Sequence, residues 1–290
     1  MSETTTAMLT LRTIAELREA LRDAERPLGL VPTMGALHEG HLALLERARA
    51  QCATVVMSLF VNPTQFAPGE DLRSYPRDED ADARLAAAAG VDVLFAPPPS
   101  EMYPDGFATT IHVAGVSERL EGAARGGSHF DGVATVVAKL LNIVGPQIAY
   151  FGQKDAQQAL VIRRLVRDLD MPVLIELCPT VRAGDGLALS SRNAYLGDDE
   201  RTRASALHRG LTAAADAIAA GERDPDAALA RARVELAAAD IEPEYLDLSD
   251  PETLAPVVRI QGPVLITLAA RVGGARLIDN VIATPGQEPR

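Results

Sequence analysis

The chain has 290 residues, of which 47% are hydrophobic, enough for one large domain or two smaller ones with a substantial core. No run approaches the roughly 18 consecutive apolar residues of a membrane span, and the first residues lack a signal-peptide pattern, so we expect a cytoplasmic protein. The 40 acidic and 28 basic residues give a net charge of -12, which repels nucleic-acid backbones and argues against such a partner.

The first 180 or so residues alternate short apolar runs with longer helical patterns. Strands are predicted at residues 28–32, 54–60, 91–97, 148–152 and 172–179, with a short extended piece at 109–113. Helices are predicted at 41–51, 78–89, 130–144 and 155–168. Near-continuous apolar strands joined by crossover helices indicate an α/β parallel sheet covered on both faces. Ligands of such sheets collect beyond the carboxyl ends of the strands.

The pattern changes after "GLALSSRN" at residues 186–193. Alanine-rich helices are predicted at 199–221 and 226–239, followed by strands at 244–250, 264–272 and 275–283. Helices followed by strands favour a separate, smaller α+β unit. We therefore predict two domains, residues 1–181 and 182–290.

The stretch "PTMGALHEGH", residues 32–41, joins a strand end to a helix start. A helix start offers backbone N–H groups and partial positive charge to a phosphate, and Gly35 and Gly40 let the backbone approach a ligand. His38 and His41 can then direct imidazole N–H groups at the same oxygens. Two alternatives stay open: a metal site, although zincin histidines are spaced by four, and a helix cap with one packed histidine.

Three more loops follow predicted strands or close the first domain. "FVNPTQF" at 60–66 offers the amides Asn62 and Gln65, or is an Asn-Pro turn. "FGQKDAQQ" at 151–158 offers a cation, a carboxylate and an amide, although a lysine after a strand is usually solvated. "GLALSSRN" offers two hydroxyls and Arg192, or a serine cap.

Together these loops indicate a nucleotide-binding domain that lacks both the Walker A pattern and a clean GxGxxG. Histidine, lysine and arginine near phosphates suit charge stabilisation during attack at phosphorus. The residues by themselves do not name the acceptor.

The same motifs, with "YPR" at 75–77, "YLDL" and "LIDN", closely resemble the pantoate-beta-alanine ligase (pantothenate synthetase) family in order and spacing. The resemblance implies a Rossmann-like domain of the class I aminoacyl-tRNA synthetase-like nucleotidylyl transferase superfamily. In this comparison "HEGH" corresponds to the HIGH motif. It also implies a smaller C-terminal domain that covers the active site, a homodimer, and a reaction that uses ATP with Mg²⁺.

The implied reaction belongs to pantothenate and coenzyme A biosynthesis and has two steps. The pantoate carboxylate attacks the α-phosphorus of ATP, giving a noncovalent pantoyl adenylate and pyrophosphate. The amine of beta-alanine then attacks the activated carbonyl, giving pantothenate and AMP.

The resemblance also implies roles for the residues at matching positions. Those expected to act in catalysis are His38, His41, Asn62, Lys154, Ser190, Ser191 and Arg192. Those expected to contact ATP are Pro32, Thr33, Met34, Gly35, Gly40, Gly152, Gln153, Lys154, Asp155, Val181 and Leu189. Those expected to bind pantoate or beta-alanine are Gln65, Tyr75, Arg125, His129 and Gln158. No residue is assigned as a metal ligand.

Two positions depart from the family pattern. The family shows R-P-x-H-F, whereas "RGGSHF" inserts one residue between Arg125 and His129 and lacks the proline. Gln153 stands where many relatives have glutamate.

Three other functions compete with the ligase. A nucleotidyltransferase of the same superfamily would need a second phosphate site, whereas the amides here suit hydroxyls and a carboxylate. The acidic net charge argues against a tRNA-binding module. A nucleotide sensor without turnover would not need His38, His41 and Lys154, so their presence argues against that function.

Overall fold

The computed structural model describes residues 8–67, 69, 72, 75 and 77–286, and the chain divides into two compact units. The N-terminal unit contains Met1–Gly152 and Val161–Pro179, and the C-terminal unit contains Gln153–Leu160 and Thr180–Arg290. Gln153–Leu160 thus pack with residues that follow much later in the chain. The predicted division at residue 182 assigns these eight residues to the N-terminal domain, and no sequence pattern indicates that they belong to the C-terminal unit.

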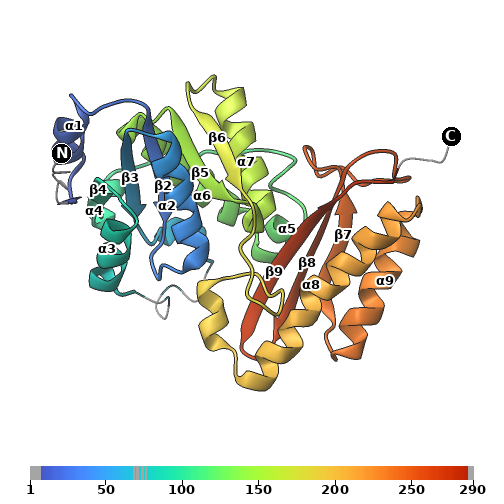
Figure 1. Ribbon diagram of the computed structural model, residues 1–290. Coiled ribbons are helices and arrows are strands. Elements are labelled where there is room, and N and C mark those ends of the chain that lie inside the picture. The colour runs from blue at the N-terminus through green and yellow to red at the C-terminus, as the bar shows by residue number, and fades with distance from the viewer. Residues whose placement is uncertain (1–7, 68, 70–71, 73–74, 76, 287–290) are drawn as a thin grey trace. The chain divides into compact units, whose positions relative to one another are not determined.

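The sheet of the N-terminal unit is parallel throughout, as predicted (Figure 1). Its strands are β1 (Leu9–Leu11), β2 (Leu28–Thr33), β3 (Thr54–Leu59), β4 (Val93–Phe95), β5 (Ile148–Gly152) and β6 (Leu174–Cys178), in the order β1-β4-β3-β2-β5-β6. The central strands β2 and β3 are buried almost throughout, which explains their continuous apolar sequence. The edge strand β1 has no sequence prediction, because it is three residues long and partly exposed.

The helices of this unit are α1 (Ile14–Leu21), α2 (Glu39–Gln51), α3 (Glu79–Ala88), α4 (Pro99–Met102), α5 (Glu121–Arg125) and α6 (Ser128–Val144). In Figure 1, α2 lies in front of the strands and α6 behind them, so helices cover both faces. The helix α7 (Ala156–Asp168) begins in one unit and ends in the other. The four helices predicted before residue 170 are confirmed, whereas α1, α4 and α5 are additional. Residues 109–113 belong to no strand.

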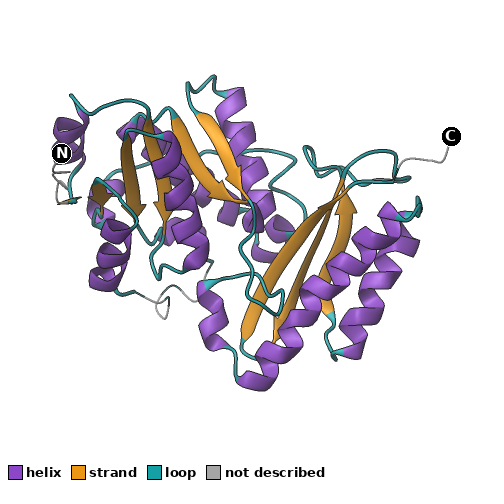
Figure 2. Cartoon of the chain, viewed as in Figure 1, coloured by secondary structure: helices purple, strands orange, loops and turns teal. Residues whose placement is uncertain are grey.

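The C-terminal unit is an α+β unit, as predicted (Figure 2). Helices α8 (Asp198–Ala219) and α9 (Pro225–Ala238) pack with an antiparallel sheet in the order β7-β8-β9. Its strands are β7 (Pro243–Ser249), β8 (Val264–Val272) and β9 (Ala275–Ala283). Within the described residues, no helix is long and apolar enough to span a bilayer.

Candidate active site

The turn after β2 brings the two histidines together at the start of α2. His38 caps the helix, because its Nδ1 accepts the N–H of Gly40 at 3.1 Å, and the Nδ1 of His41 accepts the N–H of His38 at 3.4 Å. The ring centroids lie 4.1 Å apart. Since both Nδ1 atoms accept, each neutral ring carries its proton on Nε2, where it is a donor suited to a phosphate oxygen.

Backbone N–H groups of this turn are hydrogen-bonded to side chains of the protein. A buried carboxylate from α3, that of Asp82, accepts the N–H of Ala36 at 2.9 Å and of Leu37 at 2.8 Å. The N–H of Gly40 is bonded to His38. At this helix start the imidazoles of His38 and His41 are therefore further groups suited to a phosphate, and the contact of Gly40 with ATP stays a prediction. The alternative interpretation, a histidine cap, is observed.

Asn62 and Gln65 form a buried amide cluster after β3, where Asn62 caps the short helix η1 (Pro63–Gln65) and Gln65 ends it. The Nδ2 of Asn62 donates to the Oε1 of Gln65 and to the carbonyl of Gly132, both at 3.1 Å. The Nε2 of Gln65 lies 3.3 Å from the thioether of Met34, a weak acceptor. The Gln65 amide therefore keeps donor capacity for a ligand's hydroxyl or carboxylate oxygen.

Tyr103 completes this cluster and is missed by sequence reasoning. Its hydroxyl donates to the Oδ1 of Asn62 at 2.7 Å. Burial raises the pKa of Tyr103, against a smaller opposing effect of the hydrogen bond with Thr64. The phenol is therefore neutral at physiological pH and acts as a donor.

His129 connects Arg125 to the amide cluster despite the inserted residue. The Nδ1 of His129 lies 2.8 Å from the carbonyl oxygen of Gln65, and a carbonyl only accepts, so Nδ1 carries the proton. Nε2 is then the acceptor for Arg125 Nη1 at 3.0 Å. Four residues of spacing thus bring Arg125 and His129 into contact, with Arg125 ending α5 and His129 in the first turn of α6.

The remaining predicted residues of the N-terminal unit are close in sequence to the histidine turn and to the amide cluster. Pro32 and Thr33 end β2, and the Oγ1 of Thr33 donates to the carbonyl of Ser58 at 2.9 Å. Tyr75 is buried and makes an edge contact with Phe66, whose ring centroid lies 5.9 Å away. Pro76 of the "YPR" motif lies outside the described residues.

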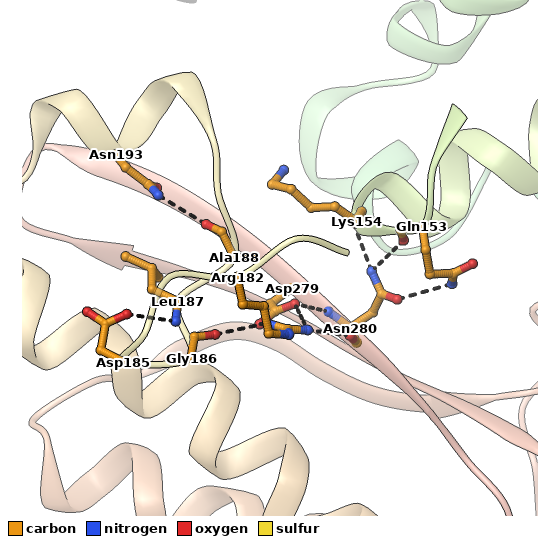
Figure 3. A network of polar contacts seen from close by, with 10 residues as sticks. All are labelled: Gln153, Lys154, Arg182, Asp185, Gly186, Leu187, Ala188, Asn193, Asp279 and Asn280. Carbon is orange, nitrogen blue, oxygen red and sulfur yellow. Dashed lines mark hydrogen bonds and ion pairs between the residues drawn. The ribbon is translucent and has the colours of Figure 1, made fainter. Parts of the chain in front are cut away.

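The turn after β5, Gln153–Asp155, carries the predicted cation (Figure 3). The Nζ of Lys154 lies 3.3 Å from the Oδ1 of Asp155, and the Lys154 side chain is 20% exposed. A buried asparagine on β9, Asn280, donates from Nδ2 to the carbonyls of Gln153 at 3.0 Å and of Lys154 at 2.8 Å. Gly152 precedes this turn, and Gln158 follows it, half-buried in the first turn of α7.

The predicted serine loop is the end of a hairpin in the C-terminal unit. The N–H of Leu189 donates to the carbonyl of Val181 at 3.0 Å, which pairs the two arms. Ser190 then caps the short helix η3 (Ser191–Tyr195) by accepting the N–H of Arg192 at 3.3 Å. The capping alternative is therefore observed for Ser190, and Ser191 and Arg192 occupy the first turn of that helix.

Residues that hold these loops were not identified in the sequence. They are Asp82, Tyr103, Arg182, Asp279 and Asn280. Only the resemblance of "LIDN" marked two of them, because a lone polar residue in a strand or helix has no local signal. Within the described part of the chain, no group of three or more His, Cys, Asp or Glu residues is placed to hold a metal ion.

Comparison with known proteins identifies the family of this chain. A family model for pantoate-beta-alanine ligase matches residues 9–282. The pantothenate synthetase of Moorella thermoacetica is 55% identical over 278 residues, covering 94% of this chain and 97% of that protein.

Solved structures extend the likeness to the fold. The crystal structure of pantothenate synthetase from Thermus thermophilus has a TM-score of 0.91 and 51% identity, covering 94% of this chain and 99% of that one. That of pantoate-beta-alanine ligase from Francisella tularensis, complexed with beta-gamma ATP and beta-alanine, has a TM-score of 0.79 and 33% identity, covering 95% and 98%. The predicted nucleotidylyl transferase fold is confirmed, and the chain belongs to the pantoate-beta-alanine ligase family.

Proposed function

We propose that the chain is an AMP-forming carboxylate-amine ligase that condenses pantoate with beta-alanine, using ATP. The match of the family model over residues 9–282 carries this proposal. The Francisella tularensis relative, complexed with beta-gamma ATP and beta-alanine, supports ATP and beta-alanine as substrates.

In the first step, a carboxylate oxygen of pantoate attacks the α-phosphorus, and the bond from that phosphorus to the β-phosphate oxygen breaks. Pyrophosphate leaves, and pantoyl adenylate stays noncovalently bound. An anion here attacks an anionic phosphate, so donors fixed in advance lower the barrier. The Nε2–H groups of His38 and His41 are suited to this, as are Lys154, Ser190, Ser191 and Arg192.

In the second step, the neutral amine of beta-alanine attacks the acyl carbon, AMP leaves with the bridging oxygen, and the nitrogen releases one proton to give the amide. AMP is a far better leaving group than oxide, which is why activation comes first. The amides of Gln65 and Gln158 bind pantoate oxygens in this proposal, and Asn62 and Tyr103 hold Gln65 in place.

Mg²⁺ enters this proposal with ATP. It is usually bound through one or two carboxylates and substrate phosphates, and it would neutralise phosphate charge. Asp155, beside Lys154, is the carboxylate that fits this use.

We place this ligase in the cytoplasm, where ATP is made available, and propose that it is a homodimer, as the sequence resemblance implies. The edge strand β6 supports an interface, because its Leu174 is 59% exposed. Light scattering after size exclusion tests the dimer, since a monomer at micromolar concentration would contradict it.

The test of the reaction is product analysis by mass spectrometry, with pantoate labelled with oxygen-18 in its carboxylate, Mg²⁺-ATP and beta-alanine. Pantothenate together with labelled AMP is expected. ADP and phosphate would instead indicate an acyl-phosphate ligase. Transfer of AMP to a phosphate, with no pantothenate, would favour the nucleotidyltransferase.

A further inference from the structure

Both polar groups of the Asn280 side chain, on β9, form hydrogen bonds with the turn that carries Lys154. Its Nδ2 donates to the carbonyls of Gln153 and Lys154, and its Oδ1 accepts the Nε2 of Gln153 at 3.2 Å. Asn280 is 4% exposed, so water does not substitute for these bonds. Two carbonyl acceptors require a two-hydrogen donor, which a carboxylate or an alkyl side chain at this position does not supply.

Asp279, the preceding residue, holds the hairpin that leads to Ser190. Its two carboxylate oxygens accept Arg182 Nη1 at 2.6 Å and Nη2 at 2.9 Å, and its Oδ1 also accepts the N–H of Asn280 at 2.7 Å. Arg182 further donates to the carbonyls of Gly186 and Asn280, both at 3.2 Å. Such a bidentate pair, with the carboxylate 2% exposed, fixes geometry closely.

The two side chains reach in opposite directions from one strand, since consecutive residues of a strand face opposite sides. Figure 3 shows Asp279 directed at Arg182 and Asn280 at Gln153 and Lys154. One dipeptide of β9 therefore holds two loops that are separated by about thirty residues in the sequence and that both carry proposed phosphate-binding groups.

We propose that Asp279 and Asn280 are positioning residues that fix the turn Gln153–Asp155 relative to the hairpin Val181–Leu189. Lys154 and the segment Ser190–Arg192 then act on the same nucleotide. This inference rests on the proposed ligase function. Both side chains are buried and bonded to protein groups, so in this inference each acts through the loop that it holds.

The first test separates positioning from stability. Asn280→Asp keeps the shape and removes the donor, whereas Leu277→Ala on the same strand weakens the hydrophobic core and leaves these bonds intact. We expect Asn280→Asp to slow adenylate formation about 30-fold through kcat, the scale of losing the bonds that orient one transition-state donor. Its reaction of supplied pantoyl adenylate with beta-alanine should stay within about twofold, because that step makes no pyrophosphate.

Leu277→Ala should lower the melting temperature and leave the adenylation rate of the folded enzyme within about twofold of the parent. Asn280→Thr retains one O–H donor and suits a strand, so it should lose less than Asn280→Asp and serves if that variant does not fold. Equal losses in both half-reactions would overturn positioning in favour of a structural role.

A double-mutant cycle tests whether Asn280 acts through Lys154. In the background of Lys154→Ala, Asn280→Asp should lower adenylation by less than about threefold, because the side chain that it positions is gone. A further loss as large as in the parent would overturn the inference. If the parent itself forms no pantoyl adenylate, the proposed function fails as well, whereas an active parent with unaffected Asn280 variants refutes the positioning alone.

Discussion

The turns after β2 and β5 differ in which main-chain groups they leave to be satisfied. After β2, the N–H groups of Ala36 and Leu37 point at a carboxylate, that of Asp82. After β5, the carbonyls of Gln153 and Lys154 point at an amide, that of Asn280. The chemistry of the supporting residue follows from the backbone, since donors need an acceptor and carbonyls need a donor.

In both turns, backbone groups are already hydrogen-bonded to a side chain from elsewhere in the chain, so side chains of the turn are the groups suited to bind a ligand. At the first turn the imidazoles of His38 and His41 are the groups suited to an anion, and at the second it is the ammonium of Lys154. The supports come from 45 to 46 residues away in one case and 126 to 127 in the other. Replacing the ligand-directed groups and the supports separately tests this division of roles.

The largest effect is expected at the second turn. Lys154→Ala should lower the rate of adenylate formation by about 100-fold or more, the scale of losing a transition-state donor. Single-turnover formation of pantoyl adenylate measures it. Arg163→Ala, which removes an exposed positive charge further along α7, should stay within about twofold. A similar loss in both variants would mean that net charge alone matters.

At the first turn, His41→Ala should lower adenylate formation by about 100-fold. It also removes the acceptor for the His38 N–H, so the melting temperature should fall. His41→Gln separates these effects, because a glutamine at this position can still accept that N–H. We expect Gln to restore the melting temperature and not the rate. Recovery of both would assign His41 to capping alone.

The support of the first turn should matter less than its imidazoles. Asp82→Asn leaves one of two half-buried N–H groups facing an NH₂ group, which costs about 1 kcal/mol of stability. We expect adenylation to fall about 10-fold as the turn loosens. Asp80→Asn, at an exposed position of the same helix, is the control for loss of charge. Chemical denaturation and single-turnover rates that do not distinguish the two variants would contradict the support role.

The smallest effect concerns stability against pH in the C-terminal unit. Burial, and secondarily the charge of Arg182, lowers the pKa of His208 from its ordinary 6.5, against an opposing effect of Asp279. Below pH 6.5 the unfolded chain therefore binds a proton that the folded chain resists, so stability falls as the pH drops. His208→Gln should reduce the fall in melting temperature between about pH 7 and pH 5.5 by on the order of 1–2 °C. Parallel curves for parent and variant would refute this.

Much of the fold was predictable because its strands are buried. The predicted strands at 148–152, 264–272 and 275–283 coincide with β5, β8 and β9. The strand β1 was not predicted, because its three partly exposed residues are too few to show an alternating hydrophobic pattern. The membership of Gln153–Leu160 in the C-terminal unit was not predicted, because contacts between residues more than one hundred positions apart leave no local sequence pattern.

Site residues could be proposed from the sequence where their chemistry shows in residue type and motif, as with His38, Lys154 and Gln65, and these roles stay predictions. The supports of the site could not be proposed in this way, since Asp82 stands in a run of acidic residues that resembles any solvated helix start. The acceptor for the N–H of Gly40, the side chain of His38 two residues earlier, was open in the sequence only as the capping alternative.

The course of α7 through both units restricts how related chains can be recombined. A fragment that stops at residue 181 contains Gln153–Leu160 but lacks Asn280, so the carbonyls of Gln153 and Lys154 lose their donor. A chimera that takes its C-terminal unit from a relative therefore needs two segments, Gln153–Leu160 and Thr180–Arg290, exchanged together. For gene shuffling, the natural crossover points thus lie inside a helix and not only in the loop between domains.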